Sequence, residues 1–132
     1  MVDALADVIE WHQQGLLPLG KQLTIDPRCR FDAILVDIDH SPNNLLHPRH
    51  AALYEPEGLV GLARHLNPGG VFALWSNDPP DAGFERAMAR AFALAHTRVV
   101  TFDNPLQLRE ASNTVYVGVK AGLTISNPME RT

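Results

Sequence analysis

Residues 31–42, FDAILVDIDHSP, decide which fold is expected for this chain, because an apolar run ends there in a group of ionisable side chains. The near-continuous apolar character of Phe31–Ile38 is typical of a strand that is covered on both faces of a sheet. Asp37, Asp39 and His40 stand at its end, and the following Pro and Asn residues have the composition of a loop. The stretch therefore predicts a buried strand whose carboxyl end carries ionisable groups.

Outward from this strand, the apolar pattern predicts alternating helices and strands. The strand–helix–strand order implies right-handed crossovers and parallel pairing, so the expected fold is an α/β sandwich with a mostly parallel sheet. No helix is predicted between the last two strands, which indicates a C-terminal antiparallel hairpin. Ligands of such sheets bind beyond the carboxyl ends of the strands. The predicted helices cover about residues 4–15, 59–66 and 84–95, and the further strands cover 71–75, 98–102 and 114–119.

Composition and charge exclude several classes of partner. The chain has 132 residues, the size of one small domain, and a formal net charge of −4 without a basic segment, so neither nucleic acid nor a membrane is an expected partner. Cys29 is the only cysteine, which excludes an internal disulfide and favours the cytoplasm. No cluster of cysteine and histidine residues has metal-ligand spacing, so no metal site is predicted.

Four stretches, which together cover most of the chain, carry a resemblance to a known family: VDALADVIEWHQQGLLPLG, FDAILVDIDHSP, LYEPEGLVGLARHLNPGGVFALWSNDPPD and NTVYVGVKA. They resemble the spermidine synthase-like (polyamine aminopropyltransferase) group of the class I S-adenosylmethionine-dependent methyltransferase superfamily. The resemblance implies a Rossmann-like domain over residues 1–121, incomplete at its N-terminal side, and a tail over 122–132. The chain is accordingly expected to be the C-terminal part of a longer transferase. Decarboxylated S-adenosylmethionine or S-adenosylmethionine would be its co-substrate, and a small-molecule amine its acceptor.

The resemblance also implies roles for individual residues. Asp3 matches the acidic residue that accepts hydrogen bonds from the ribose hydroxyls of the co-substrate. Asp37 matches the catalytic aspartate that orients or deprotonates the acceptor amine. Asp39 and His40 fall in the loop that covers the substrate. Judged from the residues alone, Asp37 and Asp39 suit a turn or a helix cap equally well, and Asp3 suits the N-cap of the first helix.

Two features of the sequence leave other functions open. One residue separates Asp37 from Asp39, whereas the family has two, and this favours a methyltransferase whose acceptor is not a polyamine. No glycine-rich strand–turn–helix segment precedes Asp3, which favours a non-catalytic binding or oligomerisation fragment. An incomplete sheet would also expose the flank of its first strand, and pairing of two copies along that edge would give a homodimer.

Overall fold

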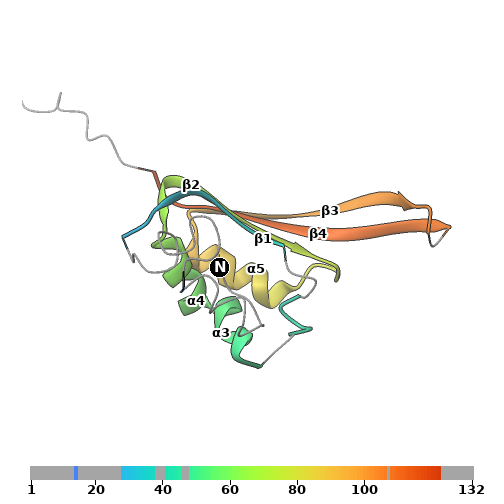
Figure 1. The fold of residues 1–132 in the computed structure, drawn as a ribbon, viewed down its shortest axis with the longest axis horizontal. Helices are drawn as coiled ribbons and strands as arrows, with labels where there is room; N and C mark the ends of the chain where they lie inside the picture. The colour runs from blue at the N-terminus through green and yellow to red at the C-terminus, as the bar shows by residue number, and fades with distance from the viewer. Residues whose placement is uncertain (1–13, 15–27, 38–40, 46–47, 107, 123–132) are drawn as a thin grey trace, which may run out of the picture.

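The computed structural model describes residues 14, 28–37, 41–45, 48–106 and 108–122. Over these ranges the chain forms a four-stranded sheet with helices packed on one side, as Figure 1 shows. Apart from Gln14 and Gly122, the predicted N-terminal helix and C-terminal tail lie outside the described residues, as do three of the predicted site residues, Asp3, Asp39 and His40.

Every predicted strand is present, together with both longer helices of the described region, but most of the strands are longer than predicted. A short helical segment before the main helices was not predicted from the sequence. The elements are β1 (Phe31–Asp37), η1 (Pro48–His50), α3 (Ala51–Tyr54), α4 (Pro56–Ala63), β2 (Leu66–Ser76), α5 (Ala82–Ala91), β3 (Leu94–Asn104) and β4 (Arg109–Val119).

The expectation of a mostly parallel Rossmann-like sandwich is wrong. The strand order is β1-β2-β4-β3, and only β1 and β2 pair in parallel, whereas β4 pairs antiparallel with both β2 and β3. Residues 105–108, which connect β3 to β4, are too few for a parallel crossover, so β4 returns as the second strand of a hairpin. β4 lies between β2 and β3 and runs antiparallel to both of them. Antiparallel pairing therefore predominates in the sheet. The hairpin itself is confirmed.

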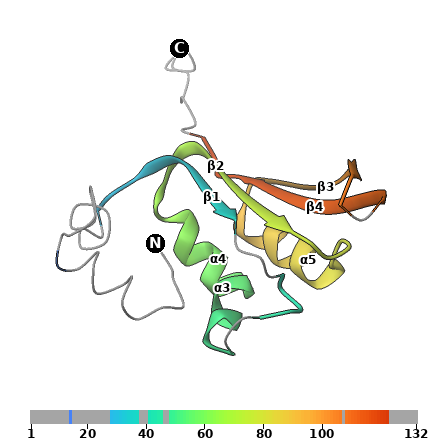
Figure 2. The ribbon, with the colours of Figure 1, turned by 45° about the vertical axis from the view of Figure 1, so that its right-hand side comes forward.

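The core lies on one face of the sheet only, among the described residues. Along β1, Ile34 and Val36 pack against the core, while Leu35, which points to the opposite face, is 73% exposed. Figure 2 shows that α3, α4 and α5 all lie on the same side of the strands. The predicted burial of β1 on both faces is therefore wrong for the described part of the chain, which has two layers. The core residues are Tyr54, Leu59, Ala63, Leu66, Phe72, Leu74, Phe84, Ala87, Met88, Phe92 and Tyr116.

Gly118 of β4 is a position where this core has little room for a side chain. A Cβ added there would lie 2.5 Å from a ring carbon of Phe92, and that ring is itself stacked on Phe72 with 5.5 Å between centroids. We expect Gly118→Ala to lower the free energy of unfolding by about 1–3 kcal/mol, the usual effect of overpacking, as measured by urea denaturation. Gly61→Ala is the matched control, since a Cβ on Gly61 meets nothing within 4 Å. An equal loss in both variants would contradict the packing described.

Candidate functional site

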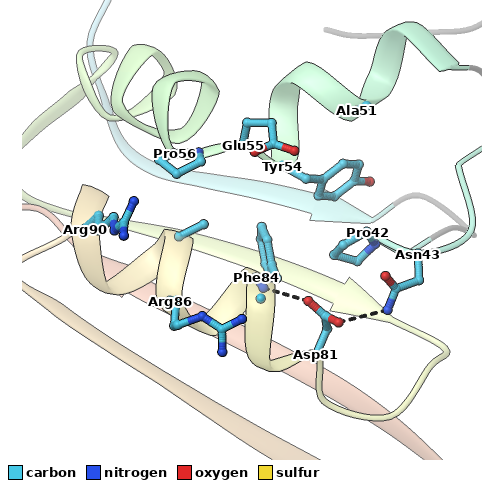
Figure 3. A pocket seen from close by; sticks show the side chains of 12 residues that line it. Pro42, Asn43, Ala51, Tyr54, Glu55, Pro56, Asp81, Phe84, Arg86 and Arg90 are labelled. Carbon is cyan, nitrogen blue, oxygen red and sulfur yellow. Dashed lines mark hydrogen bonds between the residues drawn. The ribbon is translucent and has the colours of Figure 1, made fainter.

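The polar segments that follow β1 and β2 meet at the carboxyl ends of these strands, as their parallel pairing requires. The Ser41 hydroxyl and the Asn44 side-chain amide both donate to Oδ2 of Asp78. Asn43 donates in the same way to the carboxylate of Asp81 over 3.0 Å, a bond drawn in Figure 3. The sequence predicted that these segments would share one edge of the sheet, and the hydrogen bonds between them confirm it.

Asp78 is the acceptor that holds the loop after β1 in place. Hydrogen bonds from Ser41, which has the larger effect, and from Asn44 keep the pKa of its carboxyl group below the usual value. Its backbone is fixed as well, because its carbonyl oxygen accepts a 2.6 Å hydrogen bond from the Thr114 hydroxyl and its N–H donates to the Ser76 hydroxyl. The carboxylate of Asp78 is thus already engaged by the protein itself.

This engagement predicts an acid-sensitive contribution of Asp78 to stability. Because the folded-state pKa lies below the unfolded value of about 3.9, the contribution is complete above that pH and is lost as the pH falls through the folded-state pKa. We expect Asp78→Asn to lower the melting temperature at neutral pH, with the difference from wild type narrowing below about pH 3.9. Melting temperatures of both proteins between neutral and acidic pH measure this. A difference that stays constant over the whole range would contradict it.

Asp81, like Asp78, has a structural role, in this case at the start of α5. Its carboxylate accepts a 2.6 Å hydrogen bond from the backbone N–H of Phe84, which makes it the N-cap of the helix. Its own backbone N–H donates to the buried Tyr116 hydroxyl over 2.7 Å and so ties α5 to β4. Hydrogen bonds from Asn43 and Phe84 hold the pKa of Asp81 below its usual value. This role was not predicted from the sequence, although an Asp three residues before Phe84 is a capping signal.

A cavity of about 320 Å³ lies between the loop after β1, the helices α3 and α4, and α5. Figure 3 shows Tyr54 and Glu55 on one wall, and Arg86 and Arg90 on the facing side of α5. The ring of Tyr54 meets the ring of Phe84 edge-on, with 5.7 Å between centroids, and burial raises the pKa of the Tyr54 hydroxyl. The cavity opens on the side of the sheet that carries the core.

Asp37 lies on the opposite face, at the last position of β1. Its register partner on β2 is Trp75, so the two side chains point to the same side of the sheet. Both are exposed, Trp75 to 38%, and no described residue forms a hydrogen bond to the Asp37 carboxylate. Adjacent strands are about 4.8 Å apart, which makes the two side chains neighbours. Asp37 and Trp75 are therefore an exposed carboxylate and an exposed indole at the carboxyl edge of the parallel strands.

The structure brings one predicted site residue, Asp37, to the expected edge, and the other three lie outside the described residues. No protein-family model and no curated protein matches this chain. None of the described helices has the length and apolar character needed to cross a bilayer. Within the described ranges, no three His, Cys, Asp or Glu side chains are grouped so that they could hold a metal ion. The chemistry at the sheet edge is thus the main guide to function.

Proposed function

We propose that this chain carries the acceptor-binding part of a spermidine synthase-like transferase, which moves an aminopropyl group from decarboxylated S-adenosylmethionine to a small-molecule amine. The observation that carries the proposal is the exposed pair of Asp37 and Trp75 at the carboxyl ends of β1 and β2. The resemblance of the four sequence stretches to this group supports it.

Both substrates of this reaction are cations, and the pair of side chains suits cations. The acceptor is an ammonium ion in neutral water, and the donor carries a sulfonium. A carboxylate attracts either charge directly, and an indole face attracts it through the quadrupole of the ring, most strongly for Trp. Asp78 and Asp81 are engaged by hydrogen bonds from neighbouring side chains and from the start of α5. Among the described acids at this edge, Asp37 is therefore the one available to a substrate.

The proposed step needs a base beside the acceptor. The lone pair of the amine attacks the carbon next to the sulfonium; the new C–N bond forms as the C–S bond breaks, and its electron pair leaves on sulfur as a neutral thioether. Before attack, Asp37 takes a proton from the ammonium form of the acceptor, which frees the lone pair, and it holds the resulting amine in line; the alkylated nitrogen leaves as a protonated secondary amine. In this proposal Asp3 accepts hydrogen bonds from the ribose hydroxyls of the donor, and Asp39 and His40 belong to the loop over the substrate.

Product analysis by mass spectrometry tests the proposal. The protein is incubated with a linear diamine and, in separate reactions, with decarboxylated S-adenosylmethionine or S-adenosylmethionine. We expect an aminopropylated amine with the decarboxylated donor and no product with the other. If neither donor gives a product, this chain does not catalyse the transfer and the proposal is wrong.

A second candidate is methyl transfer to an acceptor other than a polyamine. It is favoured by the single residue between Asp37 and Asp39, where the aminopropyltransferases have two. The experiment above distinguishes the two candidates, because a methylated product would form only with S-adenosylmethionine. That outcome would replace aminopropyl transfer by methyl transfer and retain Asp37 as the residue beside the acceptor.

A further inference from the structure

β3 forms one edge of the sheet, and within the described residues no strand pairs with its outer side. Eleven consecutive residues of β3, Leu94–Asn104, pair with β4 without an irregularity in the register, and no other described strand pairs with β3. In an antiparallel edge strand, alternate residues direct their N–H and C=O groups away from the sheet. β3 therefore presents a long row of backbone donors and acceptors to a further strand.

The outer part of this hairpin extends beyond the rest of the sheet. β4 pairs with β2 from Thr114 onward, and Thr114 lies opposite Val99 of β3. Residues 100–104 and 109–113 therefore pair only with each other and form a two-stranded arm. Figure 1 shows this arm reaching past the ends of β1 and β2. Its two large apolar side chains are exposed, Val100 at 40% and Phe102 at 42%. A hairpin of two strands alone is only marginally stable in water, so another strand beside β3 would stabilise it.

β3 also lacks the features that usually keep an edge strand from pairing. Such edges carry Pro, Lys, a bulge or several charges, or they are very short. The β3 sequence, LAHTRVVTFDN, has neither Pro nor Lys. The other edge, β1, is shorter, with seven residues, and its register is irregular between Phe31 and Ala33. Its two charged residues, Asp32 and Asp37, have the same sign, whereas β3 carries one Arg and one Asp. Of the two edges, β3 is the one suited to pairing.

We propose that two copies of this chain associate through antiparallel pairing of their β3 strands, so that two four-stranded sheets become one continuous sheet. A two-fold axis perpendicular to the sheet lets one edge serve both copies. With the axis at Val99, the single Arg of β3 lies opposite residue 100 of the second copy and the single Asp lies opposite residue 95. With the axis at Val100 these partners are residues 102 and 97, and with the axis at Thr101 they are residues 104 and 99. No like charges meet in any of these registers, and apolar side chains lie next to the axis. The edge is thus complementary to itself, and the homodimer expected along the first strand is assigned to β3 instead.

Sedimentation velocity with charge variants tests this inference. We expect wild-type protein to have twice the 14.5 kDa mass of one chain. Val100→Lys should reduce the mass to that of one chain in each of the three registers. The new ammonium group would face Arg98 with the axis at Val99 and its own copy with the axis at Val100, and would lie diagonal to its own copy with the axis at Thr101. Val60→Lys on α4 is the matched control, since Val60 is also 40% exposed and lies away from β3. It should leave the dimer intact.

Several results would overturn the inference. These are a single-chain mass for wild type at every concentration, a dimer that persists in Val100→Lys, or a dimer lost with Leu35→Lys on β1. If Val100→Lys fails to fold, hydrogen exchange of the wild-type protein decides instead. The amides of β3 should exchange more slowly as protein concentration rises, and exchange rates independent of concentration would exclude the dimer. Neither measurement uses transferase activity, so this inference and the proposed function fail independently.

Discussion

Replacing Asp37 by Asn is expected to lower the turnover of amine transfer at least about a hundredfold, the usual effect of losing a positioned base. The substitution keeps the size of the side chain but removes both the negative charge and the ability to take a proton. Asp37 is exposed at the carboxyl end of β1, so the change disturbs no core contact. Turnover with decarboxylated S-adenosylmethionine and a linear diamine at saturating concentrations measures the effect.

Asp32→Asn provides the control for this experiment. Asp32 lies at the other end of the same strand, is also exposed, and accepts a 2.8 Å hydrogen bond from the Asn67 side chain. We expect this variant to keep a rate close to that of wild type. Unchanged turnover in Asp37→Asn would remove Asp37 from the mechanism, and an equal loss in both variants would attribute the effect to the fold.

Truncation of Leu74 is expected to have the largest effect on stability. Leu74 is fully buried on the helix-covered face of β2, between Val36 of β1 and Tyr116 of β4. We expect Leu74→Ala to lower the free energy of unfolding by about 2–5 kcal/mol, because it loses buried apolar surface and leaves a cavity. Since small domains are stable by only about 5–15 kcal/mol, this loss is a large share of the total. Urea denaturation followed by circular dichroism measures it.

Leu35→Ala makes the same chemical change on the neighbouring strand but on the opposite face. Leu35 is 73% exposed, so its truncation should change the free energy of unfolding by no more than about 0.5 kcal/mol. If the two variants lost the same stability, the face that carries Leu35, Trp75 and Asp37 would be covered in solution. The two-layer arrangement would then be wrong, and Asp37 would not be accessible to a substrate.

Much of the secondary structure was predictable, because apolar runs and helical spacing are local signals. Phe31–Asp37 and Thr114–Val119 are recognisable as strands from their own side chains. The four-residue helix α3, Ala51–Tyr54, is too short to show a helical period. The predominance of antiparallel pairing was not predictable, because it depends on the position of β4 between β2 and β3. No local sequence pattern specifies which strand lies beside a hairpin strand.

The candidate site was also only partly predictable from the sequence. The position of Asp37 at a strand end and the meeting of the two loops follow from parallel pairing of β1 and β2. The hydrogen-bond partners within the loops do not follow from this pairing. The hydrogen bonds from Ser41 to Asp78 and from Asn43 to Asp81 depend on the conformation of the turn at residues 41–44. Sequence alone therefore could not show that, of the described acids at this edge, Asp78 and Asp81 are engaged within the protein.

Titration calorimetry of the protein with decarboxylated S-adenosylmethionine and with S-adenosylmethionine most directly tests whether the edge of the sheet beside Asp37 serves aminopropyl transfer. We expect tighter binding of the decarboxylated donor, because the carboxylates at this edge attract its positive charge and repel the additional carboxylate of the other donor. Tighter binding of S-adenosylmethionine, or no heat of binding with either donor, would contradict it.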